Sequence, residues 1–166
     1  MMSAPRPSLA GDAVRLTASL LAAFVAAAIG AVATVSNLDP WYAGLVKPPW
    51  TPPNSVFGPV WTLLYTLMGI AAWLVWRRGG SAGANVTVPL GWFVVQLVLN
   101  ALWSWLFFGW HRAGLAFLEV LLLWVAILAT ILSFRRVSAL AASLLIPYLL
   151  WVTYASALNG AIARLN

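Results

Sequence analysis

Long apolar runs separated by short polar or basic breaks dominate this chain of 166 residues. A membrane-spanning helix needs about 20 mainly apolar residues to cross a hydrocarbon core of ~30 Å. Such a span must satisfy its own backbone, because lipid offers no hydrogen-bond partners. The pattern predicts one all-α membrane domain over residues 1–166, built as a bundle of five transmembrane helices. The expected helices lie at about residues 14–36, 56–77, 86–110, 113–135 and 138–164.

Local signals refine these spans. Residues 1–11 contain two prolines and predict a short disordered arm. The apolar run over residues 16–35 is longer than the usual apolar region of a signal peptide, about 7–15 residues, so we assign it to the first transmembrane helix. The sequence GGSAGAN at residues 79–85 predicts a flexible turn, and Pro147 predicts a local kink in the last span.

The connector between the first two spans has an unusual composition. Residues 41–65 read WYAGLVKPPWTPPNSVFGPVWTLLY, with five prolines and three tryptophans. Each proline removes a backbone donor and biases the preceding residue away from helix. We interpret this Pro/Trp-rich loop as a shaped lid at the membrane surface, in which residues 41–57 cap the bundle and the remainder begins the second helix.

Composition narrows the class of protein further. The chain is 63% hydrophobic and 7% charged, whereas a soluble domain is about 25% charged, so we expect an integral membrane protein. It has no cysteine and one histidine, His111, which argues against disulfides and a resident metal. Its net charge of +6 comes from basic residues at the ends of spans, so we expect a lipid bilayer and no nucleic acid as partner.

The basic residues also predict an orientation. If the helices alternate in direction, six basic residues fall on one side of the membrane and three on the other. The positive-inside rule then places the N terminus in the cytoplasm and the proline-rich connector outside. The two sets are Arg6, Arg15, Arg77, Arg78, Arg135 and Arg136, against Lys47, Arg112 and Arg164.

The first span carries small residues at helical spacing. Ala22, Ala26, Gly30 and Thr34 share one face, and such faces let two helix backbones approach closely in lipid. Two interpretations stay open: packing against another helix of the same chain, or contact with a second copy in a homodimer.

Glu119 lies about two turns into the fourth span, where a carboxylate is costly. It is either part of a proton or cation relay or a hydrogen-bonded structural carboxyl. A relay needs partners, and the spans contain no second carboxylate.

Polar and aromatic residues share faces on three spans. Lipid contact explains any one aromatic residue, but three such faces together predict an aromatic-walled cavity for a large, flat, mostly apolar ligand. Neither paired carboxylates nor a Ser-His-Asp arrangement accompanies them, so no catalytic residue is assigned. The faces are Trp61, Tyr65 and Met68; Asn100, Trp103, Ser104 and Phe107; and Pro147, Trp151, Ala155 and Leu158.

Three long motifs resemble those of the TspO/MBR family, which includes tryptophan-rich sensory proteins and the translocator protein, or peripheral-type benzodiazepine receptor. They are the connector at residues 41–65, QLVLNALWSWLFFGW at 96–110 and PYLLWVTYASALNGAIARLN at 147–166. The resemblance implies a five-helix bundle that forms homodimers, here through Ala22, Ala26 and Gly30. It also implies a multi-pass protein of a bacterial cell membrane.

The resemblance further implies a ligand site beneath the first loop. The expected ligand is protoporphyrin IX or a haem-like tetrapyrrole, with no cofactor required. The function implied is a porphyrin-binding sensor or translocator protein. Together with the shared faces, the motifs predict as ligand-binding residues Tyr42, Trp61, Tyr65, Asn100, Trp103, Phe107, Pro147, Trp151 and Ala155.

Two alternatives accompany this expectation. Some relatives degrade porphyrin in light, and the tryptophans implicated match Trp61 and Trp151, so a photo-oxidative enzyme is one alternative. A porphyrin transporter is the other, although no inverted repeat supports it. The proposed C-terminal cholesterol motif of mitochondrial members needs a tyrosine followed within a few residues by Lys or Arg. It is broken here, because Gly160 follows Leu158 and Asn159, and Tyr154 is too far from Arg164.

Overall fold

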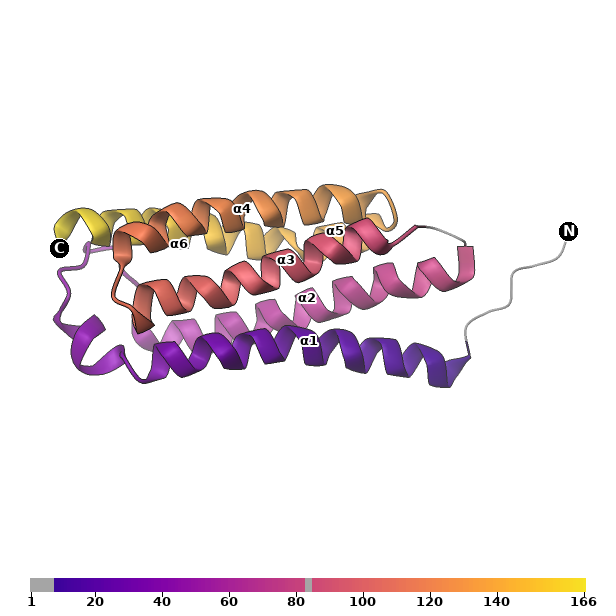
Figure 1. Ribbon diagram of the computed structural model, residues 1–166, viewed down its shortest axis with the longest axis horizontal. Coiled ribbons are helices and arrows are strands. Elements are labelled where there is room, and N and C mark those ends of the chain that lie inside the picture. Colours follow the sequence, from indigo (N-terminus) through magenta and orange to yellow (C-terminus); the bar gives the residue numbers. More distant parts are fainter. Residues whose placement is uncertain (1–7, 83–84) are drawn as a thin grey trace, which may run out of the picture.

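The computed structural model describes residues 8–82 and 85–166 and shows a bundle of long antiparallel helices (Figure 1). Five spans are long and apolar enough to cross a membrane, which confirms the predicted fold class. Two short π-helical turns, η1 and η2, adjoin the first and third spans. The elements are α1 (Leu9–Val35), η1 (Leu38–Tyr42), α2 (Asn54–Ala82), α3 (Thr87–Ser104), η2 (Trp105–Gly109), α4 (Ala113–Arg135), α5 (Ala139–Leu144) and α6 (Ile146–Leu165).

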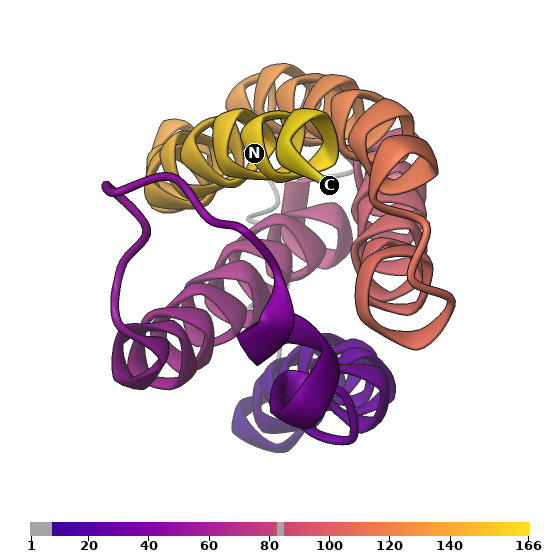
Figure 2. The ribbon, with the colours of Figure 1, turned by 90° about the vertical axis from the view of Figure 1, so that its left-hand side faces the viewer.

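The helices form a ring when the bundle is seen from the end that carries the C terminus (Figure 2). Helix α1 packs on α2 and α3, and α4 packs on α3, α5 and α6. Helix α2 closes the ring through α5. The backbone of its first half stands apart from that of α6 at this end (Figure 2).

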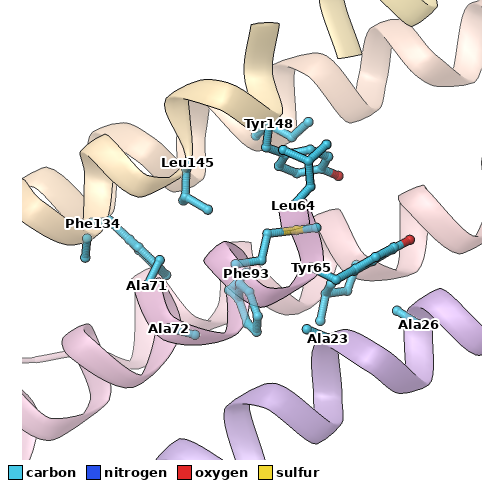
Figure 3. Close-up of a cluster of buried hydrophobic side chains, with 14 of the residues drawn as sticks. Ala23, Ala26, Leu64, Tyr65, Ala71, Ala72, Phe93, Phe134, Leu145 and Tyr148 are labelled. Atoms are coloured by element: carbon cyan, nitrogen blue, oxygen red, sulfur yellow. The ribbon is translucent and has the colours of Figure 1, made fainter. Parts of the chain in front are cut away.

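The core lies deeper in the bundle, where small residues of α1 and α2 bring the helices together (Figure 3). Close backbone approach is the usual way in which helices associate in lipid. Gly69 of α2 provides the tightest contact, because a Cβ atom there would lie 2.6 Å from Leu20 Cδ2 and 3.0 Å from Leu20 Cα. Core residues include Ala23, Ala26, Leu64, Ala71, Ala72, Phe93, Phe134, Leu145 and Tyr148.

Replacing Gly69 by alanine should destabilise the protein by about 1–3 kcal/mol, because the added methyl group must push α1 away from α2. The thermal midpoint of the purified protein in detergent measures this loss. Gly91→Ala is the matched control, since a Cβ atom there meets nothing within 4 Å. Equal midpoints for the two variants would contradict the close contact between α1 and α2.

The ends of two helices correct the sequence predictions. Helix α1 begins at Leu9 because the Ser8 Oγ accepts the Gly11 N–H at 3.2 Å, so residues 9–11 of the predicted arm are helical. Residues 1–7 lie outside the described residues. Helix α2 continues through Arg77 to Ala82, so residues 79–82 of the predicted turn are also helical. The arginines mark the end of the apolar span, whereas the helix continues beyond it.

Two spans contain a break in the α-helix. The third span changes at Ser104 from α-helix into η2 and ends at Gly109. The last span is interrupted at Leu145, two residues before Pro147, which lies in the first turn of α6. This confirms the predicted kink, since proline has no N–H to donate and is tolerated where a helix begins.

The small-residue face of α1 packs against other parts of the same chain at two positions. Ala26 and Gly30 are buried, and a Cβ atom on Gly30 would lie 2.9 Å from Ser104 Oγ of α3. Ala22 is exposed. Packing against another helix of the same chain therefore accounts for Ala26 and Gly30, and the homodimer stays a prediction.

The basic end of the bundle lies opposite the C terminus. The start of α1 and the ends of α2 and α4 lie at this end (Figure 1), and these segments carry Arg15, Arg77, Arg78, Arg135 and Arg136 of the predicted cytoplasmic side, whereas Arg6 lies outside the described residues. Asp12 lies among them, with its carboxylate 3.6 Å from the Arg77 guanidinium and accepting the Trp73 Nε1–H at 3.1 Å. The orientation itself stays a prediction.

Candidate functional site

The lid is shorter than the predicted residues 41–57, because η1 extends to Tyr42 and α2 begins at Asn54. Residues 43–53 cross the end of the bundle between these two elements (Figure 2). The first residues of the lid are held by Lys47, whose Nζ donates to the carbonyl oxygens of Tyr42 at 2.7 Å, Leu45 at 3.0 Å and Ala43 at 3.2 Å. Carbonyls at the end of a helix have no partner within the helix, and a lysine side chain is a common way to satisfy them. Lys47 therefore fixes the path of the chain as it leaves η1.

Two contacts attach the lid to α6 and to the residue that follows it. The Tyr154 hydroxyl donates to the Trp50 carbonyl at 2.9 Å, and the two rings pack edge to face. The Asn166 side-chain amide accepts the Val46 N–H and donates to the Val46 carbonyl, both at 3.0 Å. The lid is therefore anchored over the end of α6, while α2 diverges beneath it.

A cavity of about 600 Å³ lies at the end of the bundle that carries the lid, and Tyr42 and Asn54, the residues that flank the lid, are part of its lining. Its walls come from α1, η1, α2, α3, η2 and α6, and most of the lining is apolar. We call it the lid cavity. Its lining includes Phe24, Ala27 and Ala31 of α1, Tyr42 of η1, Phe57, Trp61 and Tyr65 of α2, Trp103 of α3, Phe107 of η2, and Trp151, Ala155, Leu158 and Asn159 of α6.

Aromatic rings in mutual contact build much of the wall. The ring centroids of Trp61 and Tyr65 lie 5.6 Å apart, and Trp103 stacks on Phe107 at 5.4 Å with an angle of 18° between their planes. Phe57 of α2 packs edge to face on Trp151 of α6, with ring centroids 5.9 Å apart. Contacts of this kind hold large flat side chains in place and leave apolar faces for a ligand.

Of the nine residues predicted to bind a ligand, seven line the lid cavity. Asn100 lies behind the wall, and Pro147 is exposed on the outside of the bundle. Pro147 points outward because α6 packs on the core through the adjacent Tyr148, which is fully buried. The seven that line the cavity are Tyr42, Trp61, Tyr65, Trp103, Phe107, Trp151 and Ala155.

The sequence predictions missed the α1 wall of the cavity. Ala27, Ala31 and Val35 line it at i, i+4 spacing, together with Phe24. A small-residue stripe on a membrane helix normally indicates helix packing. The i, i+4 spacing of small residues was visible in the sequence, but nothing in the sequence showed that this part of α1 faces a cavity.

Most polar groups in the wall are already hydrogen-bonded within the protein. The Tyr65 hydroxyl donates to Asn100 Oδ1, and Asn100 Nδ2 donates to the Tyr148 hydroxyl oxygen at 2.8 Å. The Trp103 Nε1–H donates to Asn159 Oδ1 at 3.0 Å. These bonds orient the aromatic rings, because a buried polar group left without a partner is costly.

Not every polar group of the lining has such a bond. The Trp151 Nε1–H is buried without a partner among the described residues. Tyr42 is a further case, at the lid end of the cavity. Its hydroxyl makes no hydrogen bond within the described part of the chain, while its ring packs on Phe108 and beneath Lys47. Burial raises the pKa of the Tyr42 phenol, and the neighbouring Tyr154 phenol raises it further. The phenol therefore keeps its proton at neutral pH and offers the cavity a neutral hydrogen-bond donor.

These features define a class: a multi-pass integral membrane protein of five spans, four of which line an aromatic-walled, mostly apolar cavity at the lid end of the bundle. Comparison with protein-family models identifies the family within this class. The model of the TspO/MBR family matches residues 18–165, and the chain belongs to this family.

Relatives from three domains of life share this similarity. The chain is 45% identical over 126 residues to the translocator protein of Homo sapiens, covering 76% of this chain and 75% of that one. It is 42% identical over 153 residues to the tryptophan-rich protein TspO of Archaeoglobus fulgidus, covering 92% and 97%. It is 41% identical over 143 residues to the tryptophan-rich sensory protein of Cereibacter sphaeroides, covering 84% and 87%.

Proposed function

We propose that the protein binds a tetrapyrrole in the lid cavity and acts as a membrane receptor or sensor for it. The observation that carries this proposal is the cavity itself, about 600 Å³ of mostly apolar space walled by indole and phenol rings. Pockets for small molecules usually measure ~300–1,000 Å³ and combine apolar walls with a few polar groups. A flat, largely apolar macrocycle suits both the size and the chemistry.

The distribution of polar groups supports a macrocycle with polar substituents at one edge. Inside the wall, Tyr65 and Trp103 have protein partners, so the deep part of the cavity favours an apolar ring. The free Tyr42 hydroxyl lies toward the lid, where an acidic side chain of a porphyrin would also reach water. The relatives' names, sensory protein and translocator protein, agree with a receptor rather than a structural role.

A titration with protoporphyrin IX in the dark tests this proposal, with affinity read from the absorbance of the porphyrin. The double variant Trp61→Phe/Trp151→Phe should bind at least about tenfold more weakly, a loss of ~1.4 kcal/mol, because both indoles line the cavity. Trp76→Phe/Trp92→Phe is the matched control, since these tryptophans are 37% and 39% exposed on the outer surface. Equal affinities for the two double variants would remove the lid cavity as the binding site.

Light-dependent degradation of the porphyrin is a second candidate, because two oxidisable indoles, Trp61 and Trp151, line the same cavity. The same samples are illuminated, and the decay of the bound porphyrin is compared with that of porphyrin in detergent alone. Faster decay that disappears in Trp61→Phe/Trp151→Phe supports an enzyme. Equal decay with and without the protein rejects it and leaves the binding proposal intact.

A further inference from the structure

The exposed part of the lid-cavity lining lies on one side of the bundle. The lining residues of η1, α3, η2 and α6 are buried or half-buried, whereas every exposed lining residue belongs to α1 or α2. The cavity therefore reaches the outer surface between these two helices. We call this region the lateral opening, and its exposed residues include Ala28, Ala31 and Val35 of α1 and Gly58 and Thr62 of α2.

Helices α1 and α2 are in close contact at one level of the bundle and leave space at another. At Gly69 a Cβ atom would lie 2.6 Å from Leu20 Cδ2, so the two helices touch there. Roughly three turns of α2 nearer the lid, a Cβ atom on Gly58 would meet nothing within 4 Å. The helix pair is therefore closed in the core of the bundle and open beside the cavity.

The residues that face each other across the lateral opening are small. Phe24 of α1 lies beside Tyr65 of α2, with ring centroids 6.4 Å apart. Because the two helices run antiparallel, Ala31 comes opposite Gly58 about two turns further toward the lid. Neither residue has a side chain large enough to close the gap. The hydrogen bond and the ion pair that the described residues form between these helices lie at the other end, at Asp12.

The hydroxyl groups beside the lateral opening are compatible with a lipid environment. Thr62 Oγ1 donates to the Gly58 carbonyl at 2.9 Å, and Thr34 Oγ1 donates to the Gly30 carbonyl at 3.0 Å. Each bond lies within one helix, so neither threonine needs water as an acceptor. Both helices are long and apolar enough to cross a membrane, and these residues lie within the two spans. The lateral opening therefore faces the hydrocarbon of the bilayer.

The lid, in contrast, is held by hydrogen bonds that entry from the water side would have to break. The Asn166 side chain pairs with both the N–H and the carbonyl of Val46. Tyr154 donates to the carbonyl of Trp50. Passage between α1 and α2 at the level of Gly58 breaks none of these bonds.

We propose that the lid cavity takes its ligand from the bilayer, through the lateral opening between α1 and α2. This inference rests on the proposed binding function and adds the route by which the site is filled. It also narrows the class of ligand to a flat, lipid-soluble macrocycle that lies in the hydrocarbon before it binds. The lid stays in place during binding and separates the cavity from water.

Cross-linking across the lateral opening tests the route, because the chain contains no cysteine that would react instead. The variant Ala31→Cys/Gly58→Cys is placed in lipid nanodiscs and bridged with a flexible bis-maleimide. Protein bridged before protoporphyrin IX is added should bind it at least about tenfold more slowly than unbridged protein. Protein bridged after loading should release it at least about tenfold more slowly. A damaged site would instead release the porphyrin faster.

The matched control bridges the lid in the same way. Val46→Cys/Asn166→Cys ties the lid to the end of the chain, where the two residues already pair, and should leave both rates unchanged. A bridge across the lid that slows both rates, or a bridge across the lateral opening that slows neither, would overturn the route while binding itself persists.

A single substitution covers the case in which the cysteine pair does not fold. Gly58→Phe should slow both association and release, because its ring enters the empty space beside Gly58. Unchanged rates in Gly58→Phe would then overturn the route. A wild type that does not bind protoporphyrin IX at equilibrium overturns the proposed function, and this route with it.

Discussion

Replacing Ala155 by phenylalanine should abolish porphyrin binding while the protein stays folded. Ala155 lines the lid cavity one turn of α6 from Trp151, which is also in the wall. A phenyl ring at this position projects into the space that a macrocycle needs, and the cavity itself accommodates it, so the helices do not have to move apart. We expect affinity for protoporphyrin IX to fall by at least about a hundredfold, or ~2.7 kcal/mol.

The matched control places the same residue on the opposite side of the same helix. Leu150 is 65% exposed, so Leu150→Phe adds a ring to the outer surface and should leave affinity unchanged. The absorbance titration and the thermal midpoint are measured for both variants. A folded Ala155→Phe that binds as tightly as the wild type would place the ligand outside the lid cavity.

The five spans could be predicted because their signal is local. Twenty or so apolar residues must become a helix in lipid, whatever their neighbours do. The helix ends depend on something else. Arg77 and Arg78 end the apolar run of α2, but the backbone hydrogen bonds continue to Ala82. The break at Leu145 was detectable because Pro147 acts on the backbone itself.

The lid cavity was predictable from helical periodicity only in part. The spacing of Trp61 and Tyr65, and of Trp151 and Ala155, identifies residues that share a face, and all four line the cavity. The same spacing included Pro147, which faces outward. Periodicity identifies a face of one helix but not what lies opposite. That depends on the divergence of α2 from α6, a property of the whole bundle.

Buried polar residues show the same limit more clearly. Asn100 reads from the sequence as one polar position on an aromatic face, and we predicted that it contacts a ligand. In the structure it lies behind the wall and joins Tyr65 of α2 to Tyr148 of α6. Sequence spacing relates residues along one helix, whereas this network connects three. The role that follows is to fix the wall, and it can be tested without any ligand.

Replacing Asn100 by leucine should therefore destabilise the protein strongly, although leucine is similar in size and better suited to an apolar interior. The substitution leaves the Tyr65 hydroxyl without its acceptor and the Tyr148 oxygen without its donor. Both residues are at least 94% buried, since their exposed fractions are 6% and 0%. Each orphaned group costs about 1–3 kcal/mol, so we expect a total loss of ~2–6 kcal/mol in the free energy of unfolding.

The triple variant Asn100→Leu/Tyr65→Phe/Tyr148→Phe separates this explanation from a loss of packing. It removes the hydroxyl groups that Asn100→Leu leaves unpaired, and replacing every partner of a hydrogen bond by an apolar group is often nearly neutral. The triple variant should thus recover most of the lost stability, measured as the free energy of unfolding in mixed detergent micelles. If it is no more stable than Asn100→Leu alone, Asn100 acts through its shape and not through its two hydrogen bonds.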